Sequence, residues 1–313
     1  RDYFTRPNYW LIDGKAYFYH AIGTDDDEKE FFNHGNALLG AFDAAGNLLW
    51  SWHLWCAEFD PADEQVELGG EVMMKRNLGA GVVSGTSEED ILASYGVYYQ
   101  WGRKDPFPGT TAFTIMNEDY TYEVDGEPEV YGIDNRVLPK FGLTAEFHGT
   151  IEKSIQNPAV FYAMTYKHTG VEDEYGEEIV ENDYKTGDWV DVSNDDYWGG
   201  ESRKKTIYDP CPVGYKVPVC DADGNTPYAW LVYTAGKWDE ANRGFEQEGQ
   251  WFPTTGTRAY ASGGLDYTEA NPYSGLWIGT KGKASDNLEL YPDLYGQYMF
   301  IIDSKRMLKV SKD

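Results

Sequence analysis

Short β-rich runs separated by tight turns are the feature that most constrains the fold of this chain. Residues 9–12 and 16–19 are rich in aromatic side chains and flank Asp13-Gly14, a dipeptide that favours two-residue hairpin turns. Residues 37–42 and 48–55 form a second pair of runs around a short turn. The sequence therefore predicts two antiparallel hairpins near its start.

The return strand of the second hairpin carries bulky side chains at both alternating sets of positions. Trp50 and Trp52 belong to one set, and His53 and Trp55 to the other. We expect both faces of this strand to be covered. His53, one of five scattered histidines, is interpreted as a hydrogen-bonded core residue. The rings expected in the core are those of Trp50, Trp52, Trp55 and Trp101.

Helix signals are few. Ser87 precedes three acidic residues and an apolar stretch that stops at Gly96, which is typical of a capped helix. Thr226-Pro227 is expected to begin a second helix that runs to Val232. Asn157-Pro158 is predicted to open a short third helix.

Two acidic, turn-rich stretches occupy the middle of the chain, at 118–129 and 171–196. Neither has the composition of a linker, so we interpret both as insertions on one domain. We expect a single α+β domain over residues 1–313, with the hairpins of residues 1–60 packed on it. Short antiparallel strands, two or three short helices and long ordered loops would build this domain.

The charge balance excludes several classes of function. The chain has 26 Lys and Arg against 53 Asp and Glu, a net charge of −27. This argues against nucleic-acid binding, which needs cations that displace counterions, and against docking on anionic membranes. No apolar run approaches the roughly 20 residues of a membrane span. We expect no direct membrane insertion by this chain, and any export signal or anchor is expected to lie outside it. Disordered chains are poor in aromatic residues, whereas Phe, Trp and Tyr make up 16% here.

The sequence contains neither a Gly-x-Ser-x-Gly elbow nor a His-Glu-x-x-His zinc motif. Many carboxylates guarantee chance pairs, but no motif selects one pair for glycoside hydrolysis. Residues 221–225 (DADGN) begin like a calcium loop, yet the glycine comes early and no Glu closes the loop. We interpret them, and the acidic runs 25–28 and 194–196, as turns. We expect no catalytic residue, no metal and no cofactor.

Three cysteines are too few for a disulfide scaffold. Cys211 and Cys220 lie nine positions apart, so a bridge between them would close a small loop and leave Cys56 unpaired. Buried free thiols are the other interpretation. The sequence leaves both open.

Four segments, in a fixed order, carry a resemblance to a known family. They are residues 35–55, 75–80, 96–108 (GVYYQWGRKDPFP) and 205–218 (KTIYDPCPVGYKVP). Together they resemble the C-terminal ligand-domain region of Bacteroidetes fimbrillin-like surface proteins, which is similar to the Fibrobacter major paralogous domain. The resemblance covers most of the chain and implies a C-type lectin-like fold of the formylglycine-generating-enzyme type.

In that setting the four motifs are interpreted as scaffold. Arg103, Lys104 and Asp105 would form ion pairs that lock an irregular loop. The run at 273–280 departs from the family pattern but keeps Trp277. Oxygen-dependent enzymes on this fold use reactive cysteines late in the chain, and none follows Cys220. The resemblance therefore implies no enzymatic activity here.

A C-terminal segment, residues 258–302, is the predicted ligand-facing part. Tyrosines are about twice as dense between Arg258 and Tyr298 as in the whole chain, and Ser, Asn and Asp lie between them. Tyrosine offers a flat apolar face and a hydroxyl at low entropic cost. The other interpretation is that half of these rings complete the core. The candidate ligand-binding residues are Tyr260, Tyr267, Asn271, Tyr273, Trp277, Tyr291, Asp293 and Tyr295.

These features together predict a non-enzymatic ligand-binding domain, an adhesin or pilus-tip module, secreted or held at the bacterial cell surface. Its expected partner is a glycan or protein on a host or neighbouring cell. Three alternatives stay open. They are a variable ligand-binding protein of a diversity-generating retroelement, a structural pilus subunit whose partners are sister subunits, and a carbohydrate-active enzyme.

Overall fold

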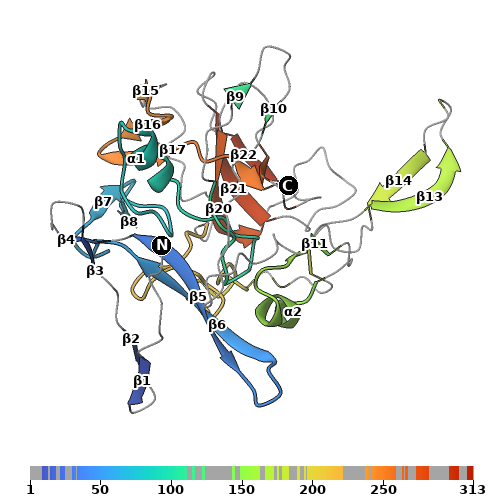
Figure 1. Cartoon of the computed structure of the whole chain (residues 1–313). Coiled ribbons are helices and arrows are strands. Elements are labelled where there is room, and N and C mark those ends of the chain that lie inside the picture. Colours follow the sequence, from blue (N-terminus) through green and yellow to red (C-terminus); the bar gives the residue numbers. More distant parts are fainter. Residues whose placement is uncertain are drawn as a thin grey trace.

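The structure is a computed structural model of the whole chain (Figure 1). It describes the backbone of every element named below. It describes side chains over residues 34–110, 149–162, 189–190, 196–220 and 241–256, and also at 175, 194, 239, 258, 263, 276 and 279. Within this part the chain has a mixed α+β architecture with two short helices and many short strands, most of them in antiparallel pairs.

The first four strand pairs are antiparallel hairpins. They are β1 (Tyr9–Ile12) with β2 (Lys15–Phe18), β3 (Ile22–Thr24) with β4 (Glu30–Phe32), β5 (Gly35–Phe42) with β6 (Leu48–Cys56), and β7 (Gln65–Leu68) with β8 (Glu71–Met74). The two hairpins expected from the sequence are thereby confirmed.

The middle of the chain holds shorter pairs. They are β9 (Ile115–Met116) with β10 (Tyr122–Glu123), β11 (Leu143–Thr144) in a parallel pair with β12 (Phe161–Tyr162), and β13 (Tyr166–Glu172) with β14 (Glu178–Asn182). Figure 1 shows the β13–β14 hairpin projecting from the rest of the molecule.

The C-terminal part contains two three-stranded antiparallel sheets and one further pair. The first sheet is β15 (Lys237–Asp239), β16 (Gly244–Gln247) and β17 (Gln250–Pro253). The pair is β18 (Thr257–Arg258) with β19 (Leu265–Asp266). The second sheet is β20 (Tyr273–Lys281), β21 (Gly296–Ile302) and β22 (Lys309–Lys312).

Helix α1 (Glu88–Ala93) forms where the capping pattern predicts it. The Ser87 hydroxyl accepts a hydrogen bond from the Asp90 amide, and three acidic residues fill the first turn. Gly96 follows with φ +77°, a left-handed conformation that favours glycine.

Helix α2 (Ile151–Gln156) lies on the other side of the predicted start at Asn157-Pro158, so that prediction is wrong. Thr150 is the N-cap, because its hydroxyl accepts from the Lys153 amide. Asn157 is instead the C-cap, and the proline behind it ends the helix. The helix expected from Thr226 to Val232 lies outside the described residues, as do residues 25–28 and 221–225.

Buried rings form the centre of the described part, and of the four rings expected there one is confirmed. Trp101 is in the core, together with Trp189 and Trp198. Trp50 and Trp55 are half-buried, and Trp52 is 49% exposed. The expectation that β6 is covered on both faces is therefore wrong. Ser51 is buried beneath a loop, and farther along β6 His53 contacts Tyr99 and Trp55 donates to the Ala80 carbonyl. Only the turn end of the β5–β6 hairpin extends outward (Figure 1).

No helix in the described part of the chain is long and apolar enough to cross a membrane. The three cysteines are free thiols, with Cys220 buried and Cys56 and Cys211 half-buried. Of the two interpretations left open by the sequence, the structure has the unbridged one.

Candidate functional site

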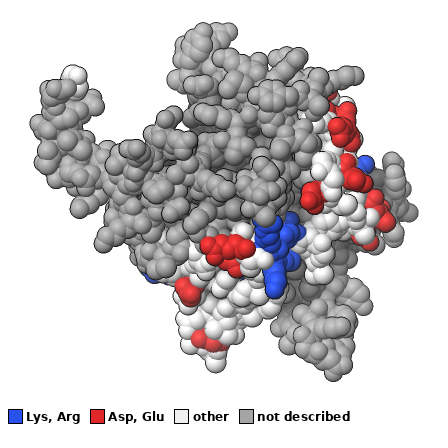
Figure 2. Space-filling model, turned by 180° about the vertical axis from the view of Figure 1, so that it is seen from behind, with Lys and Arg blue, Asp and Glu red and all other residues white. Residues whose placement is uncertain are grey.

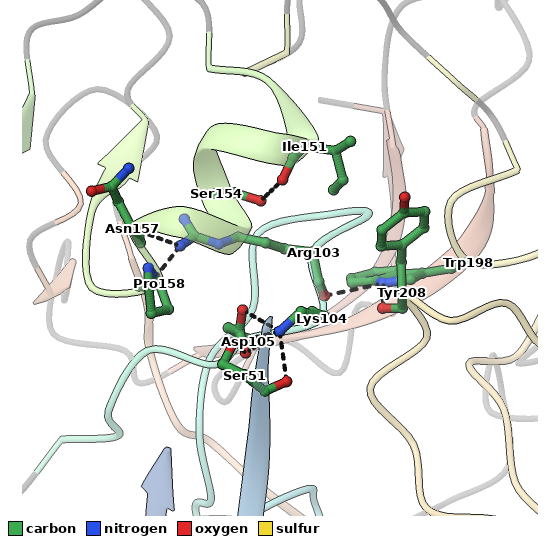
Figure 3. Close-up of polar contacts among 10 residues, drawn as sticks. All are labelled: Ser51, Arg103, Lys104, Asp105, Ile151, Ser154, Asn157, Pro158, Trp198 and Tyr208. Atoms are coloured by element: carbon green, nitrogen blue, oxygen red, sulfur yellow. Dashed lines mark hydrogen bonds and ion pairs between the residues drawn. The ribbon is translucent and has the colours of Figure 1, made fainter. Parts of the chain in front are cut away.

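A buried ion network, formed by Ser51, Gln100, Arg103, Lys104 and Asp105, holds the loops around the centre of the molecule (Figure 3). All of its members except Ser51 come from the 96–108 motif that the sequence identifies as scaffold. Isolated buried charges are costly unless they are paired and hydrogen-bonded. The contacts of each charge therefore show what the network does.

Arg103 is 0% exposed, and its guanidinium binds the chain just beyond α2. Nη1 donates to the Val160 carbonyl at 2.7 Å and to Gln100 Oε1 at 2.9 Å. Nη2 donates to the carbonyls of Pro158 at 2.7 Å and Asn157 at 3.3 Å. The planar fork of arginine suits several acceptors in one turn. The expected ion pairing is thus replaced, at Arg103, by bonds to main-chain carbonyls.

Aromatic rings enclose the same guanidinium. Its carbon lies 4.6 Å from the ring centroid of Phe107, within the range of a cation–π contact. Burial lowers the pKa of Arg103 to about 10, so the group is a cation at neutral pH. Trp198 Nε1 donates to the carbonyls of Arg103 at 3.2 Å and Tyr208 at 3.1 Å, which joins this loop to the next one.

Lys104 and Asp105 form the expected ion pair, with 2.7 Å between Nζ and Oδ2. The same Nζ donates to the Ser51 carbonyl at 2.9 Å and to its hydroxyl at 2.5 Å. The Ser51 hydroxyl donates to Asp105 Oδ1 at 2.7 Å. These bonds fasten the middle of β6 beneath the 101–107 loop, which explains why Ser51 is buried in a strand with an exposed tryptophan.

Ser51 lies beside Lys104, a pairing that in some enzymes makes the serine a nucleophile. The geometry of the two residues does not favour that role here. A general base must be neutral to accept a proton, and burial does lower the pKa of Lys104. Asp105 opposes that shift and pairs with the ammonium at both carboxylate oxygens. Ser51 is 3% exposed, so a substrate has no path to its hydroxyl. The pair therefore acts as a structural fastening.

His53 is hydrogen-bonded at both ring nitrogens, as the sequence interpretation holds. Nε2 lies 2.8 Å from Asn36 Oδ1, and Nδ1 lies 3.2 Å from the Tyr99 hydroxyl. Burial lowers the pKa of His53 to about 4, although the nearby Asp105 carboxylate acts in the opposite direction. The ring is therefore neutral at physiological pH and part of the fold.

Asp209 organises the proline-rich 205–218 motif and was not singled out from the sequence. Its buried carboxylate accepts bonds from Lys205 Nζ at 2.7 Å, the Cys211 amide at 2.9 Å and the Val217 amide at 2.9 Å. One carboxylate thus closes the whole loop. Burial raises the pKa of the Cys211 thiol, so this cysteine is not a reactive thiolate.

The C-terminal segment is attached to these anchored loops at several points. Arg258 donates to the Pro108 carbonyl at 2.9 Å and to the Gly263 carbonyl at 2.7 Å. The Gly279 amide of β20 donates to the Pro218 carbonyl at 2.8 Å. Leu276 packs against the core cluster of Leu68, Cys220 and Phe252. The segment is therefore held by both the 96–108 and the 205–218 motifs.

The candidate ligand-binding residues fall within this attached segment. Tyr273 and Trp277 belong to β20, where their backbones pair with Ile302 and Tyr298 of β21. The others lie outside the described residues: Tyr260, Tyr267, Asn271, Tyr291, Asp293 and Tyr295. Their shared surface thus stays a prediction.

The acidic run at residues 194–196 forms a turn in its described part. Asp196 accepts bonds from the Ser202 amide at 2.8 Å and the Glu201 amide at 3.2 Å, which confirms residue 196 as a turn residue. No group of three or more His, Cys, Asp or Glu among the described residues could hold a metal ion.

Comparisons with protein families, with curated proteins and with solved structures gave no match to this chain.

Proposed function

We propose that the chain is a non-enzymatic ligand-binding domain at a bacterial cell surface, an adhesin or pilus-tip module with a C-type lectin-like fold. The C-terminal segment would bind a glycan or a protein, through the candidate residues named above. The four motifs that resemble fimbrillin-like proteins motivate the fold and the location. The residues themselves motivate the mode of binding.

The observation that carries this proposal is the attachment of the C-terminal segment to loops that buried charges immobilise. A binding surface gains affinity when its elements are held in place before the ligand arrives. Arg103 holds the chain after α2, and Asp209 closes the 205–218 loop. Arg258 and Gly279 connect the C-terminal segment to the loops that contain these anchors. Such a frame suits a surface of tyrosines with interleaved Ser, Asn and Asp.

The test is a screen of the whole chain on an array of host and microbial glycans, with a parallel panel of extracellular matrix proteins. We expect a specific hit that survives in the Phe42→Ala variant. Phe42 is a matched control because its ring is 61% exposed and lies outside the segment. Combined alanine changes at Tyr260, Tyr267 and Tyr291 are expected to abolish the hit with little change in melting temperature.

Two outcomes would overturn the proposal. One is a hit that the triple variant retains in full. The other is unfolding by most single alanine changes in the segment, because a core ring costs roughly 3–5 kcal/mol when truncated and a surface ring does not.

A further inference from the structure

A basic patch stands out on this acidic molecule. It consists of the exposed residues Arg203, Lys204, Lys205 and Lys216. Lys216 Nζ donates to the Arg203 carbonyl at 2.9 Å, so the two ends of the patch meet. Figure 2 shows Lys and Arg gathered in one large group on this face, with Asp and Glu on either side. In a chain of net charge −27, such a group marks a local attraction for anions.

Exposed aliphatic side chains accompany the patch on the same short loop. Ile207 is 69% exposed and Val213 is 97% exposed. Val213 is at the tip of a tight turn in which the Tyr215 amide donates to the Pro212 carbonyl at 3.1 Å. Gly214 supplies the left-handed residue of that turn, with φ +92°. The loop is closed by Asp209, so the surface is preformed.

An acidic arm, the β13–β14 hairpin of residues 166–182, has the opposite character. Its tip and return strand (VEDEYGEEIVEND, residues 171–183) contain seven acidic residues and no Lys or Arg. The arm is a two-stranded ribbon that projects from the other elements (Figure 1). An isolated ribbon of this kind is marginally stable in water. Tyr175 at its turn is 82% exposed.

The register of the arm adds to this instability. Glu172 pairs directly with Glu178 in the antiparallel ladder. Like charges at directly opposed positions destabilise such a pair. Cations brought close to the arm would relieve that repulsion, so a basic surface is the partner that the arm itself favours.

We propose that the acidic arm of one copy of this chain docks on the basic patch of another copy. The carboxylates of the arm would meet Arg203, Lys204 and Lys216, and the Tyr175 ring would cover the exposed Val213 and Ile207. The two surfaces are different parts of the chain, so copies joined by this contact form either a two-fold pair in which each arm lies on the other copy's patch, or a ring or row of copies joined head-to-tail. This inference does not depend on the proposed ligand or on the C-terminal segment.

Overall charge limits the strength of this contact without preventing it. Two chains of net charge −27 repel each other. At physiological ionic strength that repulsion is screened beyond about 8 Å, whereas charges in direct contact are screened much less. We therefore expect weak self-association that is strongest near physiological salt and weaker at very low salt.

A long acidic polysaccharide is the less favoured occupant of the basic patch. It has no aromatic ring that could cover the exposed aliphatic side chains of the same loop.

The experiment is a charge swap read by sedimentation velocity of the full chain over a wide concentration range. The patch variant combines Arg203→Glu with Lys204→Glu, and the arm variant combines Glu172→Lys with Glu178→Lys. Each variant alone is expected to self-associate at least about tenfold more weakly than the wild type, because like charges then face each other. Mixing the two variants is expected to restore association, since the basic arm of one meets the acidic patch of the other.

The matched control combines Glu67→Lys with Glu71→Lys, two exposed acidic residues of the β7–β8 hairpin. It changes the net charge as much as the arm variant does and should not weaken association. If a double variant melts below the wild type, Lys204→Gln and Glu178→Gln replace it, and each should weaken association. A wild type that stays monomeric, variants that associate unchanged, or a mixture without recovery would each overturn the inference. So would binding of alginate at the patch with wild-type self-association absent.

Discussion

Replacing Arg103 with Met is expected to destabilise the whole domain. The guanidinium is 0% exposed and binds three main-chain carbonyls, those of Asn157, Pro158 and Val160. Methionine fills much of the same space but has no donor. The substitution therefore leaves those carbonyls without their arginine partner in a part of the chain that has no regular secondary structure.

The size of the loss follows from the contacts. The three carbonyls are only part-buried, so each costs about 1 kcal/mol when it loses its partner, the low end of the usual range, and the buried Gln100 Oε1 costs about 1–3 kcal/mol. The cation–π contact with Phe107 adds roughly 1 kcal/mol. Removal of a buried, desolvated charge offsets part of this, as the lowered pKa of Arg103 indicates. We expect a net loss of about 3–5 kcal/mol, a large part of the 5–15 kcal/mol typical of a whole domain.

Urea unfolding followed by tryptophan fluorescence measures this loss. Arg203→Met is the matched control because Arg203 is exposed, and its effect should stay within about 0.5 kcal/mol. Arg103→Lys should give an intermediate loss, since one ammonium cannot reach all three carbonyls. A loss below about 1 kcal/mol for Arg103→Met would refute the view that this residue holds the loops.

Two further predictions concern pH and glycine. The pKa of His53 is about 4 in the folded chain and about 6.5 in the unfolded one, so protonation favours unfolding and stability is lost as pH falls from 6.5 to 4. Over that range the wild type should lose about 1–3 kcal/mol more than His53→Gln in urea titrations; parallel pH profiles would contradict this. Gly199→Ala should destabilise at least about 2 kcal/mol more than Gly214→Ala. Both glycines have positive φ, but a Cβ at Gly199 would lie 2.0 Å from the Lys204 carbonyl oxygen, whereas nothing lies within 4 Å at Gly214. Equal losses by calorimetry would contradict the described packing.

Local patterns predict what local contacts determine. The β1–β2 hairpin, the hairpin around residues 43–47 and the cap at Ser87 all form as expected. In each case the decisive partners are a few positions apart in the chain. For His53 the predicted hydrogen bonds are confirmed at both ring nitrogens, whereas its predicted place in the core is wrong, because the side chain is half-buried.

Sequence patterns fail to predict burial and helix boundaries where residues far apart in the chain contact each other. Trp52 belongs to an aromatic-rich strand but is half-exposed, because the 101–107 loop covers only the region of Ser51. Trp189 lies in the acidic stretch 171–196 that was interpreted as an insertion, yet its ring is buried and donates to the Trp101 carbonyl 88 positions away. Asn157 was predicted to start a helix but ends one, because the helix is capped at its N-terminus by Thr150 and runs from Ile151 to Gln156.

In the candidate site, too, contacts between neighbours in sequence were predicted and contacts between distant residues were not. Within the 96–108 motif, Lys104 and Asp105 pair as predicted. Asp209 was missed because its three partners meet only after the loop has closed. The one available signal was that Asp209 directly precedes the prolines of the motif, which lack amide hydrogens and so leave few backbone donors near the carboxylate. Binding by the C-terminal segment is still a prediction.

The most direct test of the central claim is hydrogen–deuterium exchange of the full chain, with and without the glycan or protein selected by the array. The proposed function predicts new protection in peptides from the C-terminal segment, residues 258–302. Peptides that contain Arg103 or Asp209 should already exchange slowly and should not change, because their anchors are formed before binding. Protection confined to other parts of the chain, with none in residues 258–302, would contradict the account.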